Sequence, residues 1–238
     1  MAEEGRLSTG WIALGALLVA AATLWPFTQA LYLPLTDLPN HIARHTIMAA
    51  DDASPLLDYW SADFVIVPNT AVDLLWQLFG AGGDAIVYSH RIMAIAALNL
   101  FAAAMVLARV IHGHWTWWSL AAGLVGFNAT FLLGFQNYVF SVPFGIYAFA
   151  LYLWLEPRPA WQRALVFLAI TPVLFLMHFF AFAVLGALVF GRELQKLFEA
   201  GPHWRRALGA SARIAIPFLL PVIWLLLSLA LGPENPAG

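Results

Sequence analysis

The run "ALVFLAITPVLFLMHFFAFAVLGALVF", residues 164–190, decides how this chain is threaded through a membrane. It holds no Asp, Glu, Lys or Arg, and it exceeds the roughly 20 apolar residues that a helix needs to span about 30 Å of hydrocarbon. One interpretation is a single tilted helix, kinked at Pro172. The other is a helical hairpin that turns near Met177 and His178. Each arm would then have about a dozen residues, too few to span alone, and would have to be buried against protein or line a cavity.

The charges around this run favour the hairpin. Lys and Arg concentrate in short cytoplasmic segments. If every other apolar run crosses once, one side, which we assign to the cytoplasm, carries Arg6, Arg109, Arg158 and Arg163. A single crossing would place the basic segment 191–213 on the opposite side. A hairpin returns that segment to the cytoplasm and puts its turn, with His178, at the outer face or in a cavity open to it.

Composition indicates an integral membrane protein. Of the 238 residues, 62% are hydrophobic and 10% are charged, whereas soluble domains carry about 25% charged residues. The chain has no Cys, which excludes disulfides, thiolate nucleophiles and Cys-based metal sites, and no pattern suggests nucleic-acid recognition. We expect an all-α, polytopic helical membrane protein forming one transmembrane domain over residues 1–238. Its apolar runs lie near 11–33, 92–111, 115–135, 138–155, 164–190 and 214–231, with a long external first loop at 34–91.

The start of the external loop reads "LPLTDLPNHIARH", residues 33–45. Thr36 or Asp37 can cap a helix, and Pro39 fits its first turn. The residues that follow alternate apolar and polar positions with helical spacing. This pattern predicts a short amphipathic helix that lies on the outer membrane surface next to the first spanning helix.

One face of this expected helix gathers chemically useful side chains. Asp37, His41 and His45 recur every four residues and therefore stack on one face, with Arg44 on the same side. Either Asp37 is only a cap and the rest is a polar interfacial face, or the face is catalytic or binds an anion. The spacing of the two histidines is too common to indicate a zinc site. A hard cation, Mg²⁺ or Mn²⁺, held loosely by Asp37 together with a substrate phosphate, is the metal site that we expect.

Three segments resemble a known class of membrane enzyme: "TDLPNHIAR" (36–44), "VPNTAVDLL" (67–75) and "GFQNYVFSVPFG" (134–145). Together with a first spanning helix that leads into a large external loop, they resemble bacterial members of the GT-C superfamily of integral membrane glycosyltransferases. The resemblance implies a polyprenyl-phosphate sugar donor and a loop acid that acts on the acceptor or helps to hold a metal. Asp37 matches that acid, although no DxD motif accompanies it. Because such enzymes are usually longer, the chain is either an N-terminal portion or a minimal relative.

The side chains on this helix face also suit sugar transfer by their own chemistry, apart from the resemblance. A carboxylate can take the proton of an acceptor hydroxyl, which makes Asp37 the candidate base. Arg44 suits phosphate through its planar fork, with His41 as a second phosphate or leaving-group contact and His45 supporting either role.

Two polar groups next to the apolar runs are further candidates. Gln136 and Asn137, at an expected external turn, form either a polar cap for two helices or a wall that binds sugar hydroxyls. His178 is an ionisable group inside an apolar run and so a functional candidate by default; the alternative is a neutral imidazole bonded to a carbonyl group.

We expect sugar transfer at the extracytoplasmic face, in a bacterial inner membrane, with membrane lipid and the lipid-linked donor as partners. A transporter would place its polar residues near the middle of the membrane and often has internal repeats. Here no clear repeat is visible, and the acids concentrate in the external loop. A non-catalytic assembly subunit is the third alternative.

Overall fold

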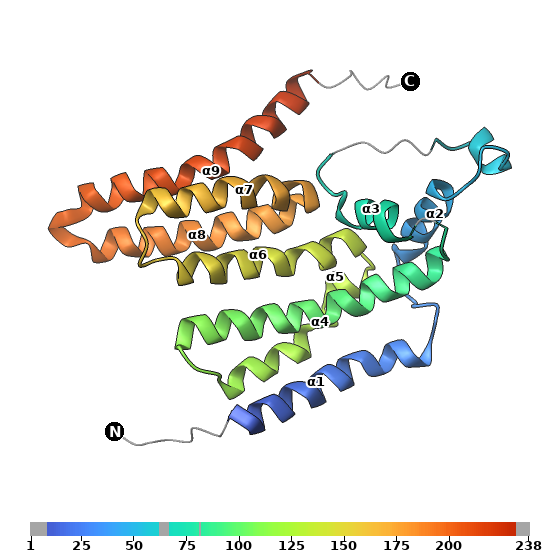
Figure 1. Ribbon diagram of the computed structural model, residues 1–238, viewed down its shortest axis with the longest axis horizontal. Helices are drawn as coiled ribbons and strands as arrows, with labels where there is room; N and C mark the ends of the chain where they lie inside the picture. The colour runs from blue at the N-terminus through green and yellow to red at the C-terminus, as the bar shows by residue number, and fades with distance from the viewer. Residues whose placement is uncertain (1–8, 62–66, 81, 232–238) are drawn as a thin grey trace.

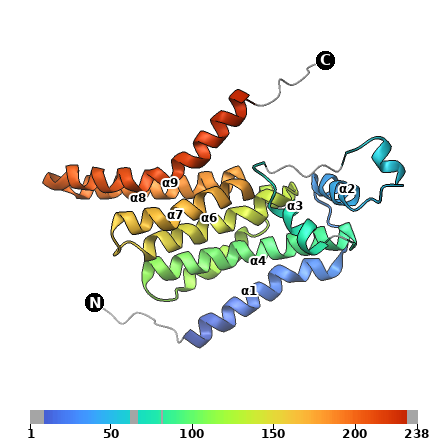
Figure 2. The ribbon, with the colours of Figure 1, turned by 45° about the horizontal axis from the view of Figure 1, so that its top comes forward.

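The computed structural model describes residues 9–61, 67–80 and 82–231, with side chains as far as Leu227. It confirms the all-α class, since the described residues form helices and no strands (Figure 1). The long helices lie side by side (Figure 2). Their bounds are α1 Thr9–Gln29, α4 Ala85–His112, α6 Gln136–Trp154, α7 Ala160–Met177, α8 Phe179–Glu199 and α9 Trp204–Leu231.

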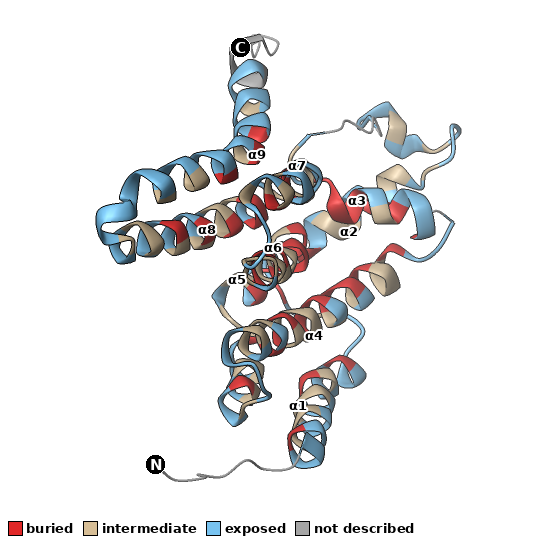
Figure 3. Ribbon diagram, turned by 60° about the vertical axis from the view of Figure 1, so that its left-hand side comes forward, coloured by how far each residue is buried: buried red, intermediate tan, exposed pale blue. Residues whose placement is uncertain are grey.

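Four of these helices are long and apolar enough to cross a membrane: α1, α4, α7 and the segment Gly201–Leu227, which holds most of α9. Large apolar side chains such as Leu17, Leu18 and Trp25 are more than half exposed on the outer faces. Lipid tails are as apolar as these side chains, so their exposure fits a bilayer. Buried residues line the faces that the helices turn toward one another (Figure 3). The chain is therefore an integral membrane protein.

The hairpin is confirmed. α7 ends at Met177 and α8 begins at Phe179, with His178 between them in an extended conformation (φ −169°, ψ 132°). The expected arm length was wrong, because the arms have 18 and 21 residues. Each helix continues beyond the apolar run, and the charged residues in these extensions form ion pairs between the two helices and within α8. Examples are Arg163 with Glu193 at 3.8 Å and Lys196 with Glu193 at 2.6 Å.

The sequence suggested that the apolar run 115–135 forms one spanning helix, and this prediction was wrong. The run forms a 3₁₀ helix, η3 (Trp117–Val125), and one turn of α-helix, α5 (Ala129–Leu132). The break occurs at Asn128, whose side chain accepts a hydrogen bond from the N–H of Phe131 and so starts a new helix. Periodicity and hydropathy do not distinguish a 3₁₀ from an α-helix, so the sequence did not reveal this division.

The second half of α9 bends away from the bundle (Figures 1 and 2). Pro217 and Pro221 lie inside this helix, and proline interrupts helical hydrogen bonding. The carbonyl group of Pro217 would normally accept from residue 221, which has no N–H. The hydroxyl group of Thr171 on α7 donates to that carbonyl oxygen instead, at 2.7 Å. α9 is thereby held to α7 at the point where it bends.

The helix order sorts the charges between the two ends of the bundle. The α2 end holds the last turn of α1, the first turns of α4 and α6, and the turn between α7 and α8, together with α2 (Leu38–Met48) and α3 (Ala71–Leu75) (Figure 1). The opposite end collects most of the Lys and Arg residues: Arg109, Arg158, Arg163, Arg192, Lys196, Arg205 and Arg206. This separation agrees with the alternation expected from the sequence, and the side on which each end lies stays a prediction.

We predict that the α2 end faces outward and the opposite end faces the cytoplasm, because basic residues are retained on the cytoplasmic side. The chain has no native Cys, so single cysteines can be introduced without further changes. In intact cells, an impermeant maleimide should label Ser61→Cys, whereas Arg205→Cys should react only after permeabilisation. Labelling of Arg205→Cys from outside would contradict this topology.

Candidate functional site

The helix expected after the first spanning segment is α2, which is amphipathic and has a proline in its first turn. Its start is fixed to the bundle, because the N–H of Asp37 donates to the carbonyl oxygen of Leu133 at 2.8 Å. Gly134 lies against this junction with φ +78°, and a Cβ atom there would come within 2.8 Å of the backbone nitrogen of Leu38. Only glycine combines that conformation with so close an approach.

Asp37 occupies the N-cap position, but its carboxylate does not accept a hydrogen bond from the helix backbone. One oxygen accepts from the side-chain amide of Asn40 at 2.8 Å. The other lies 3.3 Å from Nε2 of His41. The side chain of Asp37 is one-third exposed. The carboxylate is thus directed along the face of α2 and remains partly open to solvent.

His41 is partly buried beside this carboxylate. Burial lowers the pKa of His41 below its ordinary value of 6.5, and the nearby charge of Asp37 only partly offsets that effect. The imidazole is therefore mainly neutral at pH 7, with one nitrogen able to donate and the other able to accept.

Arg44 and His45 both face Asp73, a residue of α3 whose role the sequence did not reveal. Nε and Nη2 of Arg44 lie 3.1 and 3.0 Å from Oδ2 of Asp73. Nε2 of His45 lies 3.4 Å from Oδ1, although neither of these two atoms makes an aligned hydrogen bond to a described residue. The Asp73 side chain is 2% exposed, whereas that of Arg44 is 52% exposed. A buried carboxylate therefore holds a guanidinium that reaches the surface.

Burial by itself would raise the pKa of Asp73. Its contacts with His45 and Arg44 outweigh burial, so the pKa lies below its ordinary value of 3.8. The carboxylate is consequently ionised at neutral pH, and the buried charge is paired rather than isolated.

α3 is positioned by hydrogen bonds from three distant parts of the chain. Oδ1 of Asn137 accepts from the N–H of Val72 at 2.8 Å, and the hydroxyl group of Tyr88 donates to the carbonyl oxygen of Val72 at 2.7 Å. The N–H groups of Asn69 and Thr70 and the Thr70 hydroxyl all donate to the carbonyl oxygen of Leu176, at 3.1, 3.2 and 3.2 Å. These bonds bring Asp73 to α2.

Gln136 and Asn137 were expected at an external turn, where they could form a wall that binds sugar hydroxyls. In the structure both residues are buried beneath α3. Gln136 is 0% and Asn137 is 4% exposed. Gln136 donates to the carbonyl oxygen of Ser89 at 3.2 Å, and Asn137 holds α3 as described. Their observed contacts are structural, and contact with a sugar stays a prediction.

The order Asp73, His45, Ser89 places an acid, an imidazole and a hydroxyl group in a row. Nδ1 of His45 lies 3.4 Å from Oγ of Ser89. Such a row can activate a serine nucleophile, but Ser89 is 0% exposed, and Trp76 and Tyr88 pack on the imidazole at ring-centroid distances of 5.2 and 5.1 Å. A substrate has no access to this hydroxyl group, so the row does not form a hydrolase site.

A cavity of about 710 Å³ lies along α2, with His41 and Arg44 on one wall and Leu56, Trp60 and Ser61 on the other. Asp37 does not line this cavity but contacts two residues that do, Asn40 and His41. Three predicted site residues, Asp37, His41 and Arg44, are thus brought to one cavity and its edge, which we call the α2 cavity. His45 lies behind them in the packed interior.

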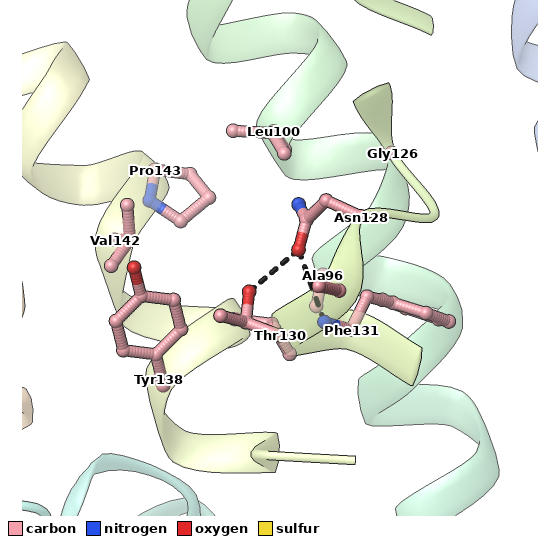
Figure 4. A pocket seen from close by; sticks show the side chains of 11 residues that line it. Ala96, Leu100, Gly126, Asn128, Thr130, Phe131, Tyr138, Val142 and Pro143 are labelled. Atoms are coloured by element: carbon pink, nitrogen blue, oxygen red, sulfur yellow. Dashed lines mark hydrogen bonds between the residues drawn. The ribbon is translucent and has the colours of Figure 1, made fainter. Parts of the chain in front are cut away.

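His178 lies apart from the α2 cavity. Its Nδ1 accepts a hydrogen bond from the N–H of Phe180 at 3.1 Å, so it caps α8. The rings of His178 and Tyr138 meet edge to face at 5.5 Å. Tyr138 in turn lines a second cavity, of about 330 Å³, between α4, α5 and α6 (Figure 4).

Metal ligands are scarce at the α2 cavity. No group of three or more His, Asp or Glu residues in the described parts of the chain could hold a metal ion. Asp37 offers one carboxylate, already in contact with Asn40 and His41. The side chains alone thus do not fit a resident Mg²⁺ or Mn²⁺, and a cation shared with a substrate phosphate stays a prediction.

No family model, no curated protein and no solved structure matches this chain.

We predict that Asp73→Asn lowers the free energy of unfolding by about 1–3 kcal/mol, because Arg44 and His45 would lose a charged partner in a buried position. Thermal unfolding of the purified protein in detergent measures the loss. Asp58→Asn, an exposed acid of the same loop, is the control and should change little. Equal stability of wild type and Asp73→Asn would show that the carboxylate does not hold α2 to α3.

The stability difference between wild type and Asp73→Asn should also depend on pH. Folding lowers the pKa of Asp73, so the stabilisation is fully present above the ordinary value of 3.8 and is lost as pH falls through the lower folded value. The stability difference between wild type and Asp73→Asn should be constant near neutrality and shrink below about pH 4. A difference that grows on acidification would contradict the assignment.

Proposed function

We propose that this chain is a GT-C-type membrane glycosyltransferase, which transfers a sugar from a polyprenyl-phosphate donor to an acceptor hydroxyl at the α2 end of the bundle. The observation that carries the proposal is the α2 cavity. There a guanidinium held by a buried carboxylate and the imidazole of His41 line one space, and the carboxylate of Asp37 contacts that imidazole at the edge of the space. The cavity lies at the end of a bundle of membrane-spanning helices.

Arg44 supplies the phosphate contact in this proposal. Two of its nitrogens are bound to Asp73, and half of the side chain remains exposed in the cavity. The pairing fixes the plane of the guanidinium, so its remaining N–H donors point in a set direction. A fixed planar fork suits the oxygens of a phosphate better than a mobile ammonium group does.

Asp37 supplies the base. The acceptor oxygen attacks the anomeric carbon of the donor, and its proton passes to Asp37. The bond between that carbon and the phosphate oxygen breaks, and the lipid phosphate leaves with the electron pair, stabilised by Arg44. One well-placed base is enough for an inverting displacement, and the neutral His41 can orient either carboxylate or leaving group by hydrogen bonding.

The position of the charges supports an enzyme over a transporter. The α2 cavity lies beside α2, at one end of the bundle. The buried ion pair of Arg163, in the first turn of α7, with Glu193, near the end of α8, lies toward the opposite end. A transporter would place its polar site near the middle of the membrane, between broken helices. A donor whose lipid lies in the bilayer presents its sugar at the surface, where the α2 cavity lies in this proposal.

We predict that Arg44→Ala weakens binding of a polyprenyl-phosphate sugar by about 10–100-fold, the loss expected for a charge-assisted hydrogen bond. Arg44→Lys should lose less, because Lys keeps the charge but not the fork. Binding of a labelled donor to purified protein measures both. Arg91→Ala, an exposed arginine on α4, is the control. Wild-type affinity in both Arg44 variants would make Arg44 only an anchor of α2.

The decisive variant is Asp37→Asn, which keeps the shape of the side chain but cannot accept the proton. We expect the variant to fold and insert normally, and sugar transfer to fall by about 10²–10⁴-fold. Turnover of a lipid-linked sugar and thermal stability are measured on the same preparation, with Asp52→Asn as the control. Near-normal turnover by Asp37→Asn would remove Asp37 as the base and leave it a structural residue.

A further inference from the structure

A third cavity lies between α8 and α9, near the end of the bundle opposite the α2 cavity. It has a volume of about 420 Å³ and almost entirely apolar walls, among them Val189 and Leu197 of α8 and Leu208, Ala215 and Phe218 of α9. α9 packs mainly on α7 and much less on α8, which leaves this space open between α8 and α9. We call it the α8–α9 groove.

The length of the groove corresponds to one leaflet of a bilayer. Its α9 wall runs from Leu208 to Phe218, which is about 15 Å along a helix. The hydrocarbon core of a bilayer is about 30 Å thick, so one leaflet contributes half of that. Leu194 and Leu208 on its walls are 38% and 48% exposed, so the groove opens toward the surrounding lipid.

The mouth of the groove is basic. Arg205 lies one turn before Leu208 on the same face of α9, and Arg206 follows it. Both arginines are exposed, and no described acidic residue forms an ion pair with either. The guanidinium of Arg205 lies 5.4 Å from the ring of Trp204, and tryptophan is typical of the membrane–water interface.

The one acid in the groove is already paired. Glu193 accepts from Lys196 at 2.6 Å and from the hydroxyl group of Ser211 at 2.7 Å. Ser211 lies about 9 Å along α9 from Arg205, so this carboxylate is deeper than the basic mouth. Glu199, the last residue of α8, accepts a hydrogen bond from Gln195 and does not line the groove. Arg205 and Arg206 therefore make the α9 side of the mouth positive, and the charge in the groove is balanced.

We propose that the α8–α9 groove binds an anionic phospholipid of the bilayer, with one acyl chain between α8 and α9 and its phosphate at Arg205 and Arg206. Basic pockets between transmembrane helices bind anionic headgroups in this way. The site is distinct from the α2 cavity and does not depend on the function proposed for that cavity.

The test adds dioleoyl phosphatidylglycerol or dioleoyl phosphatidylcholine to the full chain in detergent and follows thermal unfolding. The anionic lipid should raise the Tm by about 2–4 °C more than the zwitterionic lipid does. In the double variant Arg205→Gln with Arg206→Gln, the two lipids should give equal shifts. A control double variant at the same end, Arg109→Gln with Arg158→Gln, should keep the wild-type difference.

The acyl chain is tested by filling the groove. A Cβ atom at Gly186 would lie 3.8 Å from the ring of Phe218, whereas one at Gly191 on the same helix would meet nothing within 4 Å. Gly186→Leu should abolish the extra rise in Tm that phosphatidylglycerol gives over phosphatidylcholine. Gly191→Leu should retain this difference. Equal shifts by both lipids in wild type, or an unchanged difference in the Arg205 and Arg206 variant, would overturn the proposal. So would a wild-type dimer that Gly186→Leu dissociates, because the groove would then be an interface between two copies.

Discussion

The carbonyl oxygen of Leu176 is the acceptor on which the α2 end of the molecule depends. A helix leaves the carbonyl groups of its last turn without partners, and the break at His178 creates such an end within a long apolar run. The backbone of Asn69 and the backbone and hydroxyl group of Thr70 all donate to Leu176. That contact starts α3, and α3 carries Asp73 to Arg44 and His45. The break in one apolar run therefore determines where a polar site can form.

Much of the fold could be predicted from local sequence. The hairpin follows from the basic segment 191–213 behind the long apolar run, which a single crossing would place on the outer side. α2 follows from Asp37, Pro39 and the amphipathic spacing. These inferences succeed because charge distribution and helix starts are properties of neighbouring residues.

The site could be predicted only in part, because its key contacts join residues far apart in sequence. Asp73 lies 29 residues from Arg44, and Asn137 lies 65 residues from Val72. No periodicity links such positions, so Asp73 was only one of several loop acids, and Gln136 and Asn137 were expected at the surface. The 3₁₀ helix η3 escaped prediction for another reason, since its apolar residues satisfy the same hydropathy pattern as a spanning helix.

The two ends of the bundle pair buried or partly buried carboxylates with basic residues. At the α2 end the carboxylate of Asp73 is paired with Arg44 beside His45. At the other end Glu156 lies 2.8 Å from Arg192 and 2.7 Å from Lys196. Burial would raise the pKa of Glu156, but these partners lower the pKa to about 2. Pairing of charges at helix ends, where headgroups and water are close, costs less than it would in the middle of the hydrocarbon.

The one-residue connection at His178 leaves no slack between α7 and α8. Each residue turns an α-helix by about 100°, so a single residue inserted into the first turn of α8 would rotate the rest of that helix by this amount. Its buried stripe, which includes Ala181 and Leu185, would then face lipid instead of α6, and Gly145 would lose the close approach to the carbonyl group of Ala181 that only a glycine permits. Insertions and deletions during divergence should therefore be excluded from this turn.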